Sequence, residues 1–327
     1  MSKRVNRPVA TPESDIVRRI PAACSDEARA VEFVEELRWG SDPACPRCGD
    51  TDVAKMMNRD GTARNARYLW RCHGCKKQFT VRVGTVFEDS PIPLRVWCYV
   101  FWKACSSKKG ISALQISRET GLSYKSALFL MHRIRFAMAP DPVTPRKLEG
   151  AVEADETYVG GKPRYRTPRG SEKPAEPWQD RKAAVFAVVE RNGEVRAHPV
   201  ERVTAETVKA ALGQYVNPSA KLYTDESGVY AWASKPWPGG HETVNHSAGE
   251  YARGAATTNR VEGFFSLLKR GIYGTFHSVS KTHLHRYVDE FAFRYNHRHV
   301  DDGERTLAAL RGSDGKRLVR RPGPESF

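Results

Sequence analysis

AATTNRVEGFFSLLKRGI, the segment at residues 255–272, has the pattern of an amphipathic helix. Its apolar side chains recur with the helical period and would face a protein core: Val261, Phe265, Leu268 and Ile272. Its polar and charged side chains share a second face: Asn259, Glu262, Ser266, Lys269 and Arg270. A face of this kind is either solvated surface or a site for a metal ion and a phosphate, and the rest of the chain decides between the two.

The composition of the 327-residue chain is that of a globular protein with a strong positive charge. Hydrophobic residues make up 40% of the chain, and the net charge of +15 favours a nucleic-acid partner over a basic protein with no polyanionic partner. No apolar run is long enough to span a bilayer and the first residues do not resemble a secretory signal, so we expect no membrane partner. The seven cysteines, an odd number, favour a reducing compartment, and we predict a cytoplasmic protein.

Two CxxC pairs predict a structural zinc site: Cys45 with Cys48, and Cys72 with Cys75. Four thiolates suit one tetrahedral Zn2+, whereas a redox CxxC and a chance spacing are the alternatives. Predicted strands at 68–72 and 78–83 flank the second pair. The interval between the pairs is slightly longer than usual for a zinc ribbon, which only lengthens the connecting hairpin. We therefore predict a zinc ribbon over residues 41–90.

Residues 91–139 have the pattern of a helix-turn-helix. A turn at Gly121 separates two helical segments, and Ser123 would cap the second one. Basic residues on this second helix would meet a DNA groove, and we assign Lys125 and Arg133 to DNA binding. A plain helical hairpin has the same pattern and stays an alternative.

The segments outside these motifs are assigned by their patterning. Residues 1–25 are polar with scattered proline and arginine, and we expect them to be disordered, whereas 26–40 should form a short helix. We expect a proline-rich linker over 140–149 and a basic tail, disordered from about residue 311, over 301–327. The basic, proline-rich loop at 161–182 receives no role.

Residues 150–300 alternate strands and helices, which predicts an α/β domain. The order is strand, a hairpin around Asn192-Gly193, helix, strand, short strand and the helix quoted above. Three acids stand out: Asp155 within the first strand, Asp225 at the end of a later strand, and Glu262 on the helix. A carboxylate within or just after an apolar strand needs a partner, because burial of an unpaired charge is costly.

Metal coordination would explain the three acids together. Carboxylates suit Mg2+ or Mn2+, and two such ions can activate a nucleophile on one side and stabilise a leaving oxygen on the other. Lys269 and Arg270 would then contact the DNA phosphate. Any one acid by itself is more simply an exposed or salt-bridged residue. Glu153 is the rival ligand because it shares a strand face with Asp155, whereas Glu226 is the one neighbouring carboxylate that competes with Asp225.

Taken together, these motifs resemble the zinc-ribbon insertion-sequence transposases with a DDE catalytic core. The resemblance covers roughly residues 26–300 and is carried by CPRC, CHGCKKQFTVRVGTVFEDS, EADETYVGGK, YTDES, TNRVEGFFSLLKRGI and HLHRYVDEFAFRYN. It implies an RNase H-like fold for the α/β domain, with Asp155, Asp225 and Glu262 as its catalytic acids and Lys269 as their basic partner. Some relatives carry Asn in place of this Glu, whereas the present chain keeps Glu.

The resemblance also implies an activity and partners. Such an enzyme binds double-stranded DNA, both transposon ends and target, and recognises terminal inverted repeats through its ribbon and helix-turn-helix. With two Mg2+ (or Mn2+) ions it cleaves DNA and transfers the 3′-OH. Because two ends are joined, it implies a homo-oligomer on DNA. Two alternatives remain: a zinc-ribbon DNA-binding regulator or domesticated transposase without strand transfer, and a nuclease that does not join strands.

Overall fold

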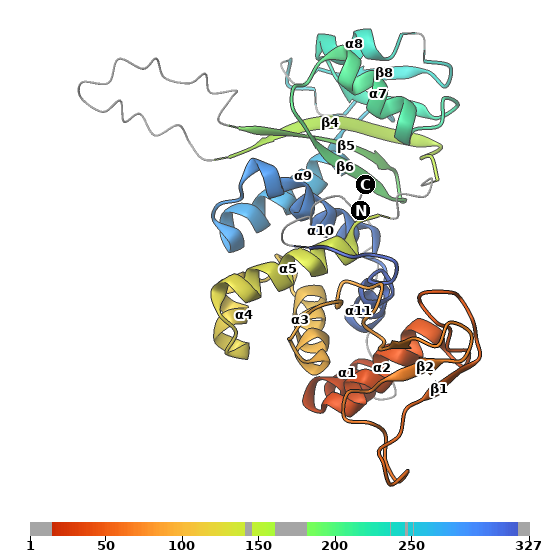
Figure 1. Ribbon diagram of the computed structural model, residues 1–327. Coiled ribbons are helices and arrows are strands. Elements are labelled where there is room, and N and C mark those ends of the chain that lie inside the picture. Colours follow the sequence, from red (N-terminus) through yellow and green to blue (C-terminus); the bar gives the residue numbers. More distant parts are fainter. Residues whose placement is uncertain are drawn as a thin grey trace, which may run out of the picture. The chain divides into compact units, whose positions relative to one another are not determined.

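The chain divides into two compact units in a computed structural model (Figure 1). The first unit combines Met1–Ala139 with Arg298–Phe327, and the second is Pro140–His297. The structure describes the following residues, with side chains from residue 18 onward: 15–140, 146–160, 182–235, 237–245, 248–250 and 252–319. In these ranges no helix combines the length and the apolar character needed to cross a bilayer.

The first unit begins with two helices. Helix α2 (Glu27–Trp39) starts at the N-cap Asp26, whose carboxylate accepts a hydrogen bond from the backbone amide of Arg29, and it confirms the predicted short helix. Helix α1 (Asp15–Ser25) corrects the prediction of disorder over 1–25, of which residues 1–14 lie outside the described part.

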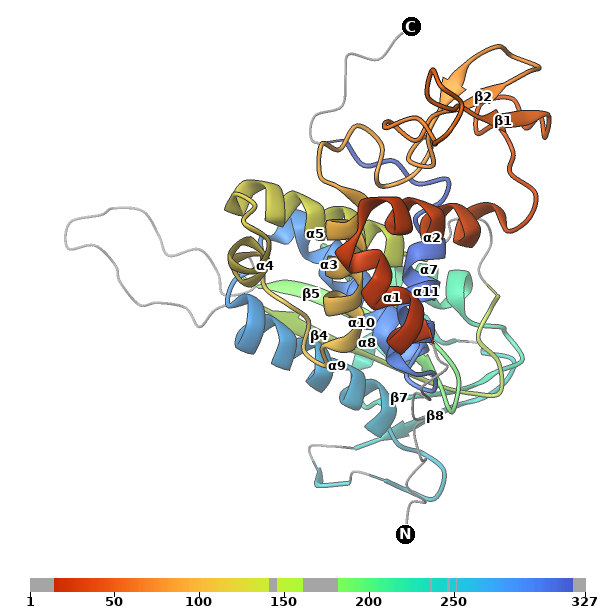
Figure 2. The ribbon, with the colours of Figure 1, turned by 90° about the horizontal axis from the view of Figure 1, so that it is seen from below.

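Helix α1 escaped prediction because its apolar stripe is short and is interrupted. Ile20 and Ala23 are buried, but arginines precede them and Pro21 lies between them, inside the helix. The helix gains its stability from packing against α3 (Leu94–Ser106), which also contacts α2 and α11 (Figure 2).

The prediction of a basic tail over residues 301–327 is wrong for its first part, which forms a helix. Helix α11 (Asp302–Arg311) has Asp301 as its N-cap and packs on α3, and Arg305 donates to the carbonyl oxygen of Cys105 at 3.0 Å. Beyond the helix, the Lys316 ammonium donates to the carbonyl oxygens of Ala137 and Ala139. The partners of this segment come from residues far away in the chain, so local patterning does not reveal them.

The predicted zinc ribbon contains three short antiparallel strands, in the order β1 (Val53–Lys55), β2 (Trp70–Cys72) and β3 (Gln78–Phe79). Strands β2 and β3 lie within the two predicted strands, although β3 ends after two residues, whereas β1 was not predicted. The ribbon is attached to α2 through Glu35, which is 6% exposed and accepts hydrogen bonds from the Trp70 indole at 2.7 Å and from both terminal nitrogens of Arg64.

Two helices with a tight turn occupy the segment that was predicted to be a helix-turn-helix. Helix α4 (Ala113–Thr120) ends at Gly121, whose φ of +71° is the left-handed conformation that favours glycine. Helix α5 (Tyr124–Met138) begins at Ser123, and the hydroxyl of this residue accepts from the amide of Ser126. The hairpin geometry is confirmed, and its DNA-binding role stays a prediction.

The second unit contains, in the described part of the chain, a five-stranded mixed sheet in the order β6-β5-β4-β7-β8. Strand β4 is antiparallel to β5 and parallel to β7, while β5 pairs antiparallel with β6 and β7 pairs parallel with β8. The strands have the following bounds: β4 (Ala151–Val159), β5 (Ala183–Glu190), β6 (Val195–Val200), β7 (Lys221–Asp225) and β8 (His241–Val244). The mixed α/β architecture is therefore as predicted.

Helices cover both faces of this sheet (Figure 1). Helices α7 (Ala205–Tyr215) and α8 (Gly228–Ala233) pack on one face, against Phe186 and Leu222 among others. Helices α9 (Asn259–Gly271) and α10 (Leu284–Asn296) pack on the other. The apolar side chains expected to anchor the quoted helix are all buried there: Val261, Phe265, Leu268 and Ile272.

Candidate active site and zinc site

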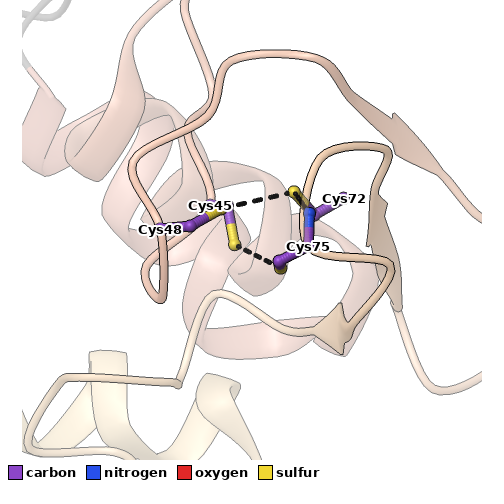
Figure 3. Close-up of side chains that lie close together, drawn as sticks. All are labelled: Cys45, Cys48, Cys72 and Cys75. Carbon is purple, nitrogen blue, oxygen red and sulfur yellow. Dashed lines mark hydrogen bonds between the residues drawn. The ribbon is translucent and has the colours of Figure 1, made fainter.

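The four cysteines form a compact cluster (Figure 3). Their sulfur atoms all lie within 4.8 Å of one another, with Cys45 to Cys75 at 3.8 Å and Cys48 to Cys72 at 3.6 Å. A tetrahedron with Zn–S bonds of about 2.3 Å has edges of about 3.8 Å, so these separations suit one zinc ion and are far too long for a disulfide. The predicted ligand set is therefore brought together.

Asp155 and Asp225 stand side by side on neighbouring parallel strands. The pairing of β4 with β7 ends at Glu153 opposite Tyr223, and Asp155 and Asp225 each lie two residues beyond that pair. Residues at one level of adjacent parallel strands point to the same face of a sheet. Here that face is the one covered by α9.

Glu262 reaches the same region from the first turn of α9. Its carboxylate accepts a hydrogen bond from the Thr258 hydroxyl at 2.7 Å, and the side chain is exposed. Burial, together with the negative charges of Glu156, Asp225 and Glu262, raises the pKa of Asp155 to about 8. Asp225 and Glu262 therefore lie close enough to Asp155 for their charges to act on it.

The acids are nevertheless spaced more widely than the cysteines. Among the described residues, only the four cysteines bring their ligand atoms within 4.8 Å of one another. The structure thus shows convergence of the three acids without a closed ligand set.

A fourth carboxylate, Glu156, lies at the same end of β4. The Tyr230 hydroxyl of α8 donates to Glu156 at 2.5 Å, while burial and the charge of Asp225 raise the pKa of the Glu156 carboxyl. Tyr230 is fully buried, and burial beside these acids raises the pKa of its hydroxyl. The sequence showed Glu156 next to Asp155, but no local pattern indicated a tyrosine partner 74 positions away.

Glu153, the other candidate metal ligand on this strand face, binds the backbone of α9 instead. Its side chain is fully buried and accepts hydrogen bonds from the backbone amides of Arg260 at 2.7 Å and Val261 at 3.2 Å. It also forms an ion pair with Arg191 at 2.8 Å. Glu153 therefore holds the N-terminus of α9. Glu226, the rival at the second strand, is exposed.

The predicted DNA-binding cations divide into accessible and buried groups. Lys125 at the start of α5 and Arg270 on α9 are exposed, and Lys269 is partly exposed two turns beyond Glu262. Arg133, by contrast, is 5% exposed.

The assignment of Arg133 to DNA binding is wrong. Its guanidinium donates to the carbonyl oxygens of Val86, Glu88 and Leu318 at 2.9 to 3.0 Å, so it connects three segments inside the first unit. The sequence gives the residue type and the helix, but the partners that cover this face of α5 lie elsewhere in the chain.

Two family models match the chain. The ISXO2-like transposase domain matches residues 147–296, which contain the three acids, and a transposase zinc-ribbon domain matches residues 25–78, which contain the four cysteines. A protein of Halobacterium salinarum, described as an uncharacterized protein in transposable element ISH50, is 31% identical over 277 residues, covering 82% of this chain and 90% of that protein. The matches cover the three acids, the four cysteines and most of the chain.

Proposed function

This chain belongs to the insertion-sequence transposases that combine a zinc ribbon with an ISXO2-like transposase domain, and we propose that it cuts and joins DNA at the ends of such an element. The observation that carries the proposal is the convergence of Asp155, Asp225 and Glu262 on one side of the sheet, with the pKa of Asp155 raised to about 8. A buried carboxylate with a raised pKa beside two further acids is typical of a functional site.

We assign the second unit to the RNase H-like fold. A mixed sheet with helices on both faces supports this, as does the origin of the acids in two adjacent parallel strands and a helix packed across them. The parallel strands place Asp155 and Asp225 together, while α9 brings in Glu262 from the side.

Asp155, Asp225 and Glu262 are suited to hold Mg2+ or Mn2+. They supply hard oxygen donors, and a bound cation would offset the burial of Asp155 and the repulsion from its neighbours, which together raise its pKa. When bound, two such ions supply charge stabilisation for the attacking and leaving oxygens of a phosphodiester. Modest closure of Glu262 toward the strands would complete the set, since its side chain is exposed and lies on the first turn of the helix.

The remaining residues of the site would bind and orient the DNA. Lys269 lies two turns beyond Glu262 on α9, where its ammonium would contact a phosphate beside the cleaved bond, and Arg270 would contact the same backbone. In the first unit, Lys125 at the start of α5 would reach the DNA of the terminal repeats, together with the zinc ribbon. Two copies of the chain would hold the two ends.

Replacement of Glu262 by Gln tests this function. We expect Glu262→Gln to abolish joining of terminal-repeat DNA in Mg2+, because the amide loses the anionic charge needed at a metal site, and to leave DNA affinity unchanged in gel-shift assays at fixed salt. The substrate is DNA carrying the inverted repeats that flank the gene.

The matched control is Glu206→Gln, at an exposed acid in the first turn of α7. It should join strands at the wild-type rate. Wild-type joining by Glu262→Gln would refute the assignment. Cleavage without joining by the wild-type protein would favour the nuclease alternative, and DNA binding with neither reaction would favour a regulator.

A further inference from the structure

The N-terminus of α9 is capped in an unusual way. Thr258 stands at the N-cap, a position where a threonine hydroxyl normally accepts a hydrogen bond from an amide of the first turn. Here it forms no such side-chain bond; its hydroxyl instead donates to the carboxylate of Glu262, at 2.7 Å. The cap residue is thus bound to the acid that it precedes.

Another residue takes over the capping. The carboxylate of Glu153, on β4, accepts from the amides of Arg260 and Val261 at 2.7 and 3.2 Å, the donors that an N-cap side chain would serve. An anionic group at this position also interacts favourably with the helix dipole. Glu153 therefore caps the helix, and Thr258, the residue at the N-cap position, donates its hydrogen bond to Glu262 instead.

Arg191 compensates the buried charge of Glu153. Its Nε donates to Glu153 at 2.8 Å, its Nη2 donates to the Thr257 carbonyl oxygen at 3.1 Å, and the guanidinium lies 4.2 Å from the centre of the Tyr223 ring. A buried carboxylate with three donors is satisfied, whereas removal of one partner of such a pair is strongly destabilising. The arrangement is therefore rigid.

This network connects the acids directly. Glu153 lies two residues before Asp155 on the same face of β4, and the helix that it caps carries Glu262 in its first turn. The position of Glu262 relative to Asp155 is thus set by one strand and one capping interaction. Helix α7 shows that a threonine N-cap is enough to cap a helix without a carboxylate from a neighbouring strand, since Thr204 there caps its own first turn in a complete capping box.

We propose that Glu153 and Thr258 are positioning residues that set Glu262 against Asp155 for metal binding. The inference rests on the proposed function, because it requires that these acids bind the ion. Thr258 restrains the carboxylate of Glu262, while Glu153 fixes the helix that carries it. Neither residue contacts the metal.

Two threonine variants separate positioning from stability. Thr258→Val keeps the shape of the side chain and removes only the hydroxyl, so we expect about tenfold weaker binding of Mn2+ in calorimetry. Its melting temperature should change little, because Glu153 still caps the helix. Thr204→Val, the matched control, should lower the melting temperature, because it removes a cap, and should bind Mn2+ as the wild type does.

Glu153→Gln tests the other half of the network. The amide oxygen can still accept from the two backbone amides, but the charge opposite Arg191 is lost, so the variant should be less stable and should bind Mn2+ less tightly. The double variant Glu153→Gln, Arg191→Gln removes both charges and should recover part of the stability. Mn2+ affinity should stay below the wild-type value in both variants, measured well below their melting temperatures.

The controls distinguish this inference from the proposed function. If Glu262→Gln and the wild type bind Mn2+ equally, the metal site itself is wrong. If Glu262→Gln loses binding while Thr258→Val and Glu153→Gln bind as the wild type does, the metal site stands and the positioning role is overturned. A joining rate that falls in Thr258→Val and recovers at saturating Mn2+ would support it.

Discussion

The two predicted metal sites of this chain are built in opposite ways. The cysteine cluster comes from two short CxxC segments, and its sulfur atoms lie within 4.8 Å of one another. The carboxylates come from two strands and a helix, and among the described residues they do not reach that spacing. The cysteine site, which is encoded by local spacing, is therefore compact, whereas the carboxylate site, which is assembled by tertiary packing, is wider.

Charge gives a physical reason for the difference. Four cysteines carry no obligatory charge, so protonated thiols can pack closely before an ion arrives. Carboxylates repel one another at neutral pH, and the pKa of Asp155 is raised first by its burial and then by the negative charges of its neighbours. The acid site therefore needs stronger support from the surrounding fold, which Glu153 and Arg191 provide.

The largest effect is expected at the cysteine cluster. Cys72→Ser should lose the zinc ion and the fold of residues 41–88, because in small ribbons the energy of metal binding, roughly 10 kcal/mol or more, is also folding energy. Metal analysis should find about one zinc per wild-type chain and none in the variant, and limited proteolysis should cut the ribbon. Cys24→Ser, outside the cluster, should keep its zinc. Purified wild-type protein without zinc would contradict the assignment.

A smaller effect is expected where the ribbon joins α2, and it sharpens the comparison. Glu35→Gln leaves the Arg64 guanidinium without its carboxylate partner and should cost about 3 kcal/mol of stability. Zinc content should stay at the wild-type level, because the four ligands depend on local geometry. Loss of zinc in this variant would show that the cysteine site also depends on tertiary support.

The smallest effect concerns pH. The folded-state pKa of Asp155 is about 8 and its unfolded value about 3.9, so the metal-free protein loses stability as pH rises between these values. In EDTA at pH 8, Asp155→Asn should therefore raise the melting temperature of the protein. The same variant should lose the stabilisation that Mg2+ gives the wild type.

The matched control for Asp155→Asn is again Glu206→Gln, whose acid is exposed. It should melt as the wild type does in EDTA and keep the full response to Mg2+. An Asp155→Asn protein that melts below the wild type at pH 8 would mean that its carboxylate is stabilised in the metal-free state, and the contrast between the two sites would fail.

Sequence reasoning succeeded where the decisive interactions are local. The CxxC spacing determines which sulfurs meet, the helical period determines which face of residues 255–272 is buried, and Gly121 with Ser123 determines the turn between α4 and α5. Each of these features depends on the spacing of residues within short segments, which can be recognised directly in the sequence.

The tertiary structure alone decided what depends on distant partners. Arg133 was assigned to DNA by its type, yet three carbonyl oxygens from other segments bury it. Helices α1 and α11 form because α3 covers their short apolar stripes.

Glu153 and Asp155 show most clearly that the sequence alone does not determine the role of a carboxylate. They share one strand face and one chemical group, and by sequence either could be a metal ligand. Only the fold places the amides of α9 and the charge of Arg191 against Glu153, and Asp225 and Glu262 beside Asp155. The reason is physical: the role of a carboxylate is set by the charges and donors around it, and here those come from residues as many as 108 positions away.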